Sequence, residues 1–339
     1  MRIEASAVVD RGQYQDAVTP WERGDWRGAA LDWVAGELAA RGLGTDGHAR
    51  VRLRPWSVLM RVPVAGRRAV WFKANPPETA FEGALTAALA RWMPEHVLEP
   101  LAVDAERGWS LLPDGGELFR DLVAREAVGP RAWEEFLLQY AALQRALVGR
   151  TQEILRLGVP DARTPALPEV LDRLVATNAA LRPDERTRLR RFRPRVEEWC
   201  AELAAVGIAD SLDHSDLHDG QLFRPAAGRY VFFDWGDAAV SHPFCSLPVA
   251  ARSACERYGP GVLPRLRDAY LEPWTGEGRT TADLRRAVSL AWRLAALGRA
   301  GSWVRLFPAA GAVAAGAADT DGAAESAHWL LELFSDPPL

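Results

Sequence analysis

The segment "LDHSDLHDGQLF" (residues 212–223) crowds aspartates and histidines into one short stretch between apolar residues. Such a stretch is poorly suited to a core, because burying a charged side chain without a partner is costly. It is also more acidic and more histidine-rich than an ordinary surface loop. We therefore regard it as the candidate site and ask which chemistry needs these side chains together.

One hypothesis is a zinc site, because His214, Asp216, His218 and Asp219 are all residue types that bind zinc. A hydrolytic zinc centre needs ligands on a shared face and usually draws some from elsewhere in the chain. Only His242 is near in sequence. A histidine-ligated metallohydrolase is therefore the weaker hypothesis.

The other hypothesis is phosphoryl transfer, which needs an aspartate at the acceptor hydroxyl, oxygen ligands for Mg²⁺ and a lysine on the nucleotide phosphates. Asp216 can accept the proton of the hydroxyl, and Gln221 offers an amide oxygen. Asp234 lies in "RYVFFDWG" (229–236), which is predicted to pair as a strand with the residues that begin at Leu222. The acidic loop and Asp234 are therefore expected at neighbouring strand ends.

A suitable lysine occurs in an earlier, strand-rich part of the chain. Residues 48–77 contain short runs of Val, Leu, Trp and Phe, which predict antiparallel strands, and Lys73 stands in the last run. Residues 78–93 have the spacing of an amphipathic helix with Glu82 on the apolar stripe. A carboxylate on that stripe needs a partner, and Glu82 is placed to orient Lys73.

The hydrophobic pattern divides the rest of the chain. Residues 28–44 are predicted to form a first helix, and residues 96–119 two further strands that end in a Pro-Asp-Gly-Gly break, the expected lobe boundary. Apolar periodicity beyond it predicts helices near 131–148, 168–182, 186–205, 260–271, 281–305 and 324–334.

Length and composition limit the class of protein. The 339 residues are enough for two lobes with separate cores. With 48% hydrophobic residues, 25% charged residues and a formal net charge of −4, the chain has the composition of a globular protein without a general attraction to nucleic acid or anionic membranes. The first 15 residues lack the apolar run of a secretory leader, so none is expected. The alanine-rich tract 309–318 is too short to span a bilayer, and the three cysteines lack a CxxC spacing. A cytoplasmic protein is expected.

The two motifs together resemble those of the aminoglycoside phosphotransferase family, small-molecule relatives of the eukaryotic-like protein kinases. That family's catalytic loop runs H-G-D-L-H-x-G-N and its metal strand ends in I-D-W-E or a similar sequence. Here these are "HSDLHDGQ" (214–221) and "FFDWGD" (232–237). The resemblance covers roughly residues 50–305 and implies an α+β, bilobal, protein-kinase-like fold. Residues 1–113 would form an N-terminal helix and a small β-rich nucleotide-binding lobe, and residues 114–339 a mainly helical lobe with the catalytic loop and the substrate pocket.

The resemblance also implies roles for individual residues. Asp216 is expected to be the catalytic base, Gln221 and Asp234 the Mg²⁺ ligands, and Lys73, paired with Glu82, the contact to the α- and β-phosphates. The hinge whose backbone meets the adenine is matched by Leu111, Leu112, Pro113 and Asp114. The two histidines of the loop, His214 and His218, are expected to hold its shape by hydrogen bonds.

Several positions depart from the family pattern. Gln221 replaces an asparagine, so its amide lies one methylene further out. Ser215 replaces a glycine, which predicts that this position does not need a positive φ. No glycine-rich loop precedes the second strand; "RPWS" (54–57) stands there instead, and Arg54 or Ser57 is the candidate for part of the phosphate contact. Beyond Asp234, Asp237 can support the site from behind.

The implied function is transfer of the γ-phosphate of ATP, with GTP as the alternative, to a hydroxyl of a small molecule with the help of Mg²⁺. Asp210, Asp213 and Asp219 add negative charge around Asp216, which favours a cationic acceptor such as an aminosugar or aminoglycoside. A neutral sugar, a macrolide or an amino alcohol stays open. The rival hypothesis is a nucleotide-binding pseudokinase that acts through interaction, suggested by Gln221 and the missing glycine loop. Neither nucleic acid nor a membrane is expected as a partner.

Overall fold

The computed structural model describes residues 3–12, 14, 20–66, 68–276, 278–306 and 320–339. The alanine-rich tract 309–318 lies outside these residues. The chain folds as two compact units, Met1–Gly115 with Arg305–Asp321 and Gly116–Val304 with Gly322–Leu339.

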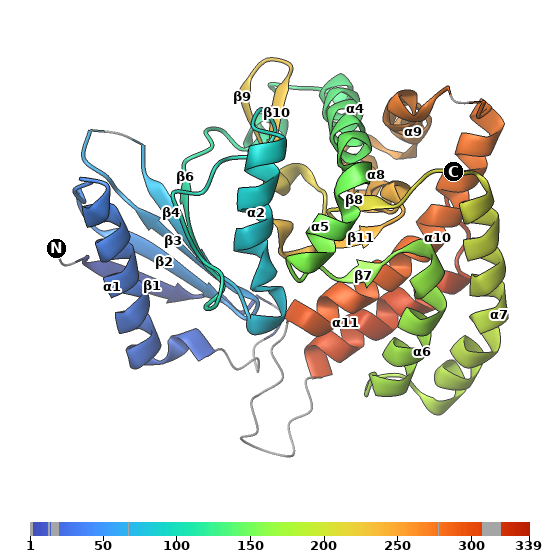
Figure 1. Ribbon diagram of the computed structural model, residues 1–339, viewed down its shortest axis with the longest axis horizontal. Coiled ribbons are helices and arrows are strands. Elements are labelled where there is room, and N and C mark those ends of the chain that lie inside the picture. Colours follow the sequence, from blue (N-terminus) through green and yellow to red (C-terminus); the bar gives the residue numbers. More distant parts are fainter. Residues whose placement is uncertain (1–2, 13, 15–19, 67, 277, 307–319) are drawn as a thin grey trace. The chain divides into compact units, whose positions relative to one another are not determined.

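The first unit is built on a six-stranded sheet in the order β1-β2-β3-β4-β6-β5 (Figure 1). The strands are β1 Ala5–Val9, β2 Ala49–Arg54, β3 Ser57–Val62, β4 Val70–Ala74, β5 Ala102–Asp104 and β6 Trp109–Pro113. All neighbours from β2 onward are antiparallel, which confirms the strands predicted within 48–77 and 96–119. The edge strand β1, parallel to β2, was not predicted, because all of its side chains are exposed and no alternating pattern marks it.

Two helices cover the two faces of this sheet (Figure 1). They are α1 Gly24–Ala40 and α2 Phe81–Trp92. Val34 and Leu38 of α1 belong to one buried core with Phe72 of β4. The next residue of β4, Lys73, contacts Glu82 of α2. Because successive strand residues point to opposite faces, α1 and α2 lie on opposite sides. The predicted helix 28–44 is thus confirmed, although α1 begins and ends about one turn earlier.

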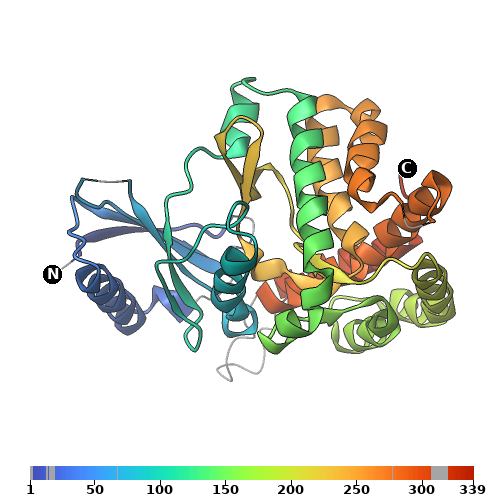
Figure 2. The same ribbon diagram turned by 45° about the horizontal axis from the view of Figure 1, so that its top comes forward.

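The second unit is mainly helical. Its elements are α3 Phe119–Ala124, α4 Pro130–Leu147, α5 Thr151–Arg156, α6 Leu167–Thr177, α7 Pro183–Ala205, α8 Leu247–Tyr258, α9 Leu263–Leu271, α10 Thr281–Leu306 and α11 Thr320–Leu331. The six predicted helical segments are confirmed as α4, α6, α7, α9, α10 and α11, while α3, α5 and α8 were not predicted. Figure 2 shows α4 running alongside α8 and α9, against both of which it packs.

Five short strands position the candidate site within this unit. They are β7 Asp161–Ala162, β8 Ser211–Asp213, β9 Leu222–Ala226, β10 Arg229–Phe232 and β11 Ala239–Ser241. β9 and β10 form the predicted antiparallel hairpin, with Phe232 opposite Leu222. β11 pairs antiparallel with β8, so Val240 lies opposite Leu212. The loop 214–221 and the segment 233–238 therefore begin and end in paired strands, which holds the two motifs side by side.

None of the helices in the described part of the chain combines the length and the hydropathy of a bilayer-spanning segment.

Candidate active site

A buried ion pair in the first unit joins the sheet to α2. Lys73 Nζ lies 2.8 and 2.6 Å from the two carboxylate oxygens of Glu82, and both side chains are buried. Asn75, just beyond β4, also donates its amide N–H to Glu82. The predicted pairing of Lys73 with Glu82 is confirmed, whereas the contact of Lys73 with phosphates stays a prediction.

A glycine lets α2 approach the sheet closely. A Cβ added at Gly83 would lie 2.8 Å from Cγ1 of Val103 in β5 and 3.7 Å from the Trp109 carbonyl oxygen in β6. The neighbouring residue of this helix is Glu82. The close packing of α2 on β5 and β6 therefore helps to fix the carboxylate that holds Lys73.

The hinge segment lies at the end of β6. Leu111 is fully buried, and its carbonyl oxygen accepts a hydrogen bond of 2.7 Å from Leu101 N–H, so this carbonyl is already engaged. Leu112 and Pro113 are partly exposed, and Pro113 can only accept because proline has no N–H. Asp114 accepts a hydrogen bond of 3.5 Å from the Trp71 indole. Adenine binding by this segment stays a prediction.

The turn between β2 and β3 differs from a glycine loop. It consists of Pro55 and Trp56, neither of which has a positive φ. Arg54 Nε lies 3.6 Å from Asp10, and its guanidinium lies 5.8 Å from the Trp56 ring. Ser57 is buried at the start of β3. Because proline offers no N–H, this turn has fewer backbone donors for phosphate than a glycine loop, and a phosphate contact by Ser57 stays a prediction.

In the second unit, three donors surround the carboxylate of Asp216. Oδ1 lies 3.2 Å from Arg299 Nη2, and Oδ2 lies 3.3 Å from Gln221 Nε2 and 3.5 Å from His218 Nε2. Burial alone would raise the pKa of Asp216, but the Arg299 guanidinium and then His218 hold it well below its usual range. A carboxylate offers about four acceptor positions, so the ionised Asp216 has capacity for one more donor, such as a hydroxyl.

The surroundings of His218 determine its tautomer. The Gly220 N–H and Arg120 Nη2 lie 2.9 and 3.0 Å from His218 Nδ1. Both groups can only donate, so Nδ1 carries the lone pair and the neutral ring has its proton on Nε2, facing Asp216. Arg120 also donates to Asp219 at 2.8 Å. His218 thus shapes the loop through hydrogen bonds, as predicted.

His214 ties the loop to the segment that precedes Asp234. Its Nε2 donates to the carbonyl oxygen of Phe233 at 2.9 Å, and its backbone N–H donates to the Tyr140 hydroxyl at 2.9 Å. The imidazole lies 4.7 Å from the Trp235 ring, and burial lowers the pKa of His214, so the ring is neutral. The predicted supporting role of His214 is confirmed.

The prediction that position 215 does not need a positive φ is wrong. Ser215 has φ 60°, in the left-handed region. Its backbone N–H and its Oγ both donate to the buried Asp213 carboxylate, at 2.8 and 3.0 Å. These bonds compensate for the strain that a side chain usually suffers there, so a serine can occupy a position where glycine is common.

The three aspartates expected to surround Asp216 with negative charge are engaged elsewhere. Asp213 is buried and accepts from Ser246 Oγ at 2.5 Å as well as from Ser215. Asp210 accepts from the Thr164 hydroxyl at 3.0 Å, and Asp219 is paired with Arg120. These three carboxylates therefore do not supply free negative charge that would favour a cationic acceptor.

The hairpin brings Gln221 and Asp234 to the same end of β9 and β10. Phe233 N–H donates to the Gln221 carbonyl oxygen at 3.1 Å, and Asp234 follows with φ 66°. Because the ionised Asp216 requires a donor, the side-chain N–H₂ of Gln221 faces it, and the amide oxygen of Gln221 is directed away from Asp216. An amide oxygen beside a carboxylate is a donor set that suits Mg²⁺, so these residues fit the expected metal.

The zinc hypothesis has no such support. Within the described ranges of the chain, no three His, Cys, Asp or Glu side chains gather as a metal site built from them requires. His242 is buried, and its Nδ1 accepts the backbone N–H of Phe244 at 3.2 Å. It therefore caps a 3₁₀ turn, Pro243–Ser246.

Two arginines of the site were not predicted. Arg120 comes from α3, and Arg299 comes from α10, far along the chain from Asp216. The signal for Arg299 was available, because it falls at helical spacing from the buried residues Trp292, Ala295 and Ala296. A charged residue on such a stripe needs a partner, as Glu82 does.

Comparisons with known proteins agree with this geometry. The sequence matches the family model described as "Phosphotransferase enzyme family" over residues 28–285. Similar solved structures include a macrolide 2'-phosphotransferase from Brachybacterium faecium, with 18% identity, 91% of this chain and 99% of that chain covered, and a TM-score of 0.54. A GDP complex of an aminoglycoside 2'-phosphotransferase has 14% identity, 89% and 97% coverage and a TM-score of 0.53. A Plasmodium vivax ethanolamine kinase has 9% identity, 86% and 81% coverage and a TM-score of 0.55.

At these identities the solved structures inform on the fold alone, and they confirm the expected α+β, protein-kinase-like fold. No curated protein matches the chain.

Proposed function

The chain belongs to the Phosphotransferase enzyme family and is a phosphotransferase that acts on hydroxyl groups, and on that premise we propose that it transfers the γ-phosphate of ATP, with Mg²⁺, to a hydroxyl of a small molecule. The observation that carries this proposal is the Asp216 carboxylate, which is ionised and held by three donors. Beside it, Gln221 and Asp234 share one end of a hairpin.

In the proposed reaction, Asp216 accepts a hydrogen bond from the acceptor hydroxyl and orients its oxygen toward the γ-phosphorus. A bond forms between that oxygen and phosphorus, the bond from phosphorus to the β–γ bridging oxygen breaks, and ADP leaves. The proton passes from the hydroxyl to Asp216. A carboxylate with a lowered pKa is a weak base, but it suffices because such transition states are loose and catalysis is mostly positioning and charge stabilisation.

Gln221 and Asp234 would hold Mg²⁺ through an amide oxygen and a carboxylate. When bound, the ion neutralises charge on the phosphate oxygens. Gln221 serves two purposes in this proposal, because its N–H₂ group supports Asp216 while its oxygen is directed elsewhere.

We assign nucleotide binding to the first unit. Lys73 would contact the α- and β-phosphates with its position set by Glu82, and Leu112 and Pro113 would offer backbone groups to the base. Leu111, buried in the same strand, would support these two residues from the core. Ser57 would offer its hydroxyl to the phosphates. ATP is the proposed donor; GTP is the alternative, because a structurally similar aminoglycoside 2'-phosphotransferase was solved with GDP.

The charged side chains around Asp216 and the proposed metal ligands indicate the kind of acceptor. Four carboxylates and two guanidinium groups meet there: Asp216, Asp219, Asp234 and Asp237 against Arg120 and Arg299. Four minus two leaves two negative charges. Burial opposes protonation of His218, but Asp216 and Asp219 raise its pKa to about 9, and counting it as a cation leaves one negative charge; neither total exceeds the charge of one Mg²⁺ ion. The protein's own side chains therefore supply no excess charge that would attract a polycation, so we propose an acceptor with at most one amine, such as an aminosugar or a macrolide, rather than a polycationic aminoglycoside.

The test is a phosphorylation panel with product detection by mass spectrometry. Glucosamine, erythromycin, ethanolamine, a fructosamine and kanamycin are incubated with the protein, Mg²⁺ and ATP or GTP. We expect one added phosphoryl group on an acceptor with one amine or none, and no product when EDTA removes the metal. A clear preference for kanamycin would refute the charge argument. Binding of ATP and Mg²⁺ without transfer to any compound would refute the proposed function and favour a pseudokinase.

A further inference from the structure

We propose that Arg299 is a positioning residue for phosphoryl transfer, which bridges the two sequence motifs of the site and is itself held by the helix α11. This proposal rests on the proposed function of Asp216. It concerns a residue that lies on α10, outside both motifs.

Arg299 connects a carboxylate of each motif. Its Nη2 lies 3.2 Å from Asp216 Oδ1, and its Nη1 lies 3.6 Å from Asp237 Oδ1. The residue is only 9% exposed, so solvent screens these ion pairs weakly. A guanidinium is planar and has nitrogens that reach two acceptors at once, which the single ammonium of lysine does not reproduce.

Arg299 and two other donors together restrain both oxygens of the Asp216 carboxylate. Arg299 takes Oδ1, whereas Gln221 and His218 take Oδ2. With both oxygens held, rotation of the carboxylate about its Cβ–Cγ bond is restricted. The remaining acceptor position is then directed to one place, which is what a residue that orients a hydroxyl requires.

The hydrogen bonding of Arg299 is incomplete for a residue whose purpose is structural. Its Nε and Nη1 are buried and make no hydrogen bond with any described residue. Buried donors without acceptors are unfavourable. A guanidinium that served only to join α10 to the loop would be expected to satisfy more of its N–H groups, so the charge facing Asp216 and Asp237 is the better explanation for its presence.

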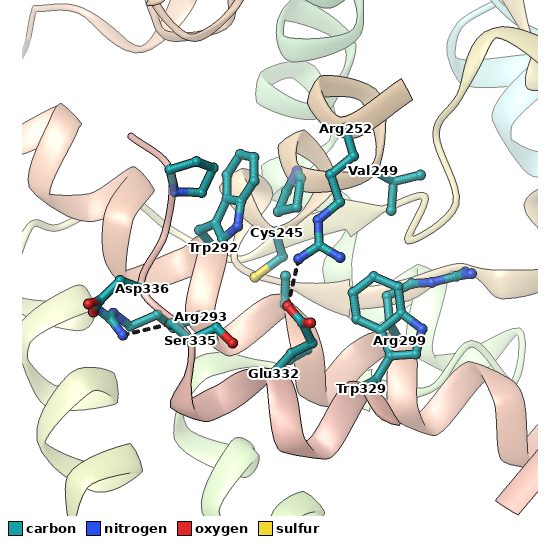
Figure 3. A pocket seen from close by; sticks show the side chains of 14 residues that line it. Cys245, Val249, Arg252, Trp292, Arg293, Arg299, Trp329, Glu332, Ser335 and Asp336 are labelled. Carbon is teal, nitrogen blue, oxygen red and sulfur yellow. Dashed lines mark hydrogen bonds and ion pairs between the residues drawn. The ribbon is translucent and has the colours of Figure 1, made fainter. Parts of the chain in front are cut away.

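Aromatic side chains hold the guanidinium in place. Its Cζ lies 5.8 Å from the Trp303 ring, one turn further along α10, and 5.6 Å from the Trp329 ring of α11. The same Trp329 ring is 4.9 Å from Arg252 of α8, which forms an ion pair of 2.9 Å with Glu332. Figure 3 shows the Trp329 ring beside Arg299 with the Arg252–Glu332 pair next to it, along a cavity of about 100 Å³. α11 thus supports Arg299 through the Trp329 ring.

The main test replaces Arg299 by Met and by Lys and measures kcat and KM with ATP, Mg²⁺ and the panel compound that the wild type phosphorylates fastest. We expect Arg299→Met to lower kcat about 100-fold, the scale of a misplaced catalytic group, with KM for ATP unchanged within about threefold. Arg299→Lys restores part of kcat, because it returns the charge without the fork. Trp329→Leu lowers kcat less than Arg299→Met does, because Trp329 acts through Arg299.

The matched control is Arg293→Met. Arg293 is on the same helix, lies 5.0 Å from the Trp199 ring and pairs with Asp336 at 2.7 Å, away from the catalytic loop. Its replacement is expected to leave kcat unchanged. If the wild type transfers phosphate and the kcat of Arg299→Met equals that of Arg293→Met, the inference is overturned while the proposed function stays intact.

A second measurement does not depend on activity. Urea midpoints are compared for Arg299→Met, Asp216→Asn and the double variant, and we expect the double variant to shift less than the sum of the single shifts, because the two residues interact. Additive shifts would overturn the inference. If the wild type phosphorylates nothing, the proposed function fails, and the positioning role of Arg299 fails with it. The coupling between the two substitutions in urea then still decides whether Arg299 contacts Asp216.

Discussion

Replacing Glu82 by Gln removes one charge from the buried pair with Lys73 and leaves the shape of the side chain almost unchanged. The two groups lie 2.6 Å apart at their closest, with side-chain exposures of 7% for Lys73 and 5% for Glu82. At an effective dielectric constant of about 20, their attraction is about 6 kcal/mol before desolvation is considered. Removing one partner of such a buried pair destabilises a protein by about 3 kcal/mol or more, because the remaining charge stays buried.

Hydrogen exchange of the amides of β4 measures this change within the first unit. A loss of about 3 kcal/mol corresponds to exchange about 100-fold faster for amides that exchange through unfolding of that unit. The control is Glu37→Gln in α1, where the partner Arg41 lies 2.5 Å away but both side chains are about one third exposed, so the expected change is below about 1 kcal/mol. Equal, small effects of the two substitutions would refute the view that burial makes the Lys73–Glu82 pair strong.

Three further predictions concern residues that support the fold and the loop. Burial lowers the pKa of His242 to about 3, so between this value and the ordinary pKa of about 6.5 only the unfolded chain gains the proton, and the free energy of unfolding decreases as the pH is lowered. His242→Asn keeps a capping acceptor and should recover about 2 kcal/mol at pH 5 in urea denaturation. An unchanged dependence of stability on pH would contradict this. Ser215→Val should lower the free energy of unfolding by about 2 kcal/mol in thermal unfolding, because of the φ of 60° and the lost hydrogen bond to Asp213. Ser215→Gly should lower it by less than about 1 kcal/mol. Equal costs of the two substitutions would speak against backbone strain. Gly83→Ala should destabilise the protein by about 1 kcal/mol, because the added Cβ would clash with Val103. Gly28→Ala, whose added Cβ would have no atom within 4 Å, should stabilise it by about the same amount. Stabilisation by both substitutions would argue against close packing of α2.

The sequence predicts the parts of the site whose geometry is local. Asp216 and Gln221 belong to one loop, and Asp234 follows a short antiparallel hairpin in which Phe232 lies opposite Leu222. The Lys73–Glu82 pair was predictable because a carboxylate on an apolar helical stripe needs a cation, and a lysine precedes it on a strand.

Other features depend on tertiary packing that local spacing does not encode. Arg299 stands on a buried stripe, but nothing in its neighbourhood identifies Asp216 as the residue that it contacts. The φ of Ser215 depends on whether Asp213 turns back to accept its hydrogen bonds. The exposed edge strand β1 has no alternation because neither of its faces is buried.

The central claim is that Asp216 orients the acceptor hydroxyl for phosphoryl transfer, and it is tested most directly by single-turnover transfer from radiolabelled ATP. Wild type and Asp216→Asn are compared with Mg²⁺ and the compound phosphorylated fastest in the panel, and nucleotide affinity is measured on the same samples. We predict that the substitution slows transfer by about 100- to 10,000-fold and leaves nucleotide affinity unchanged within about threefold. Transfer by Asp216→Asn at the wild-type rate would contradict the account.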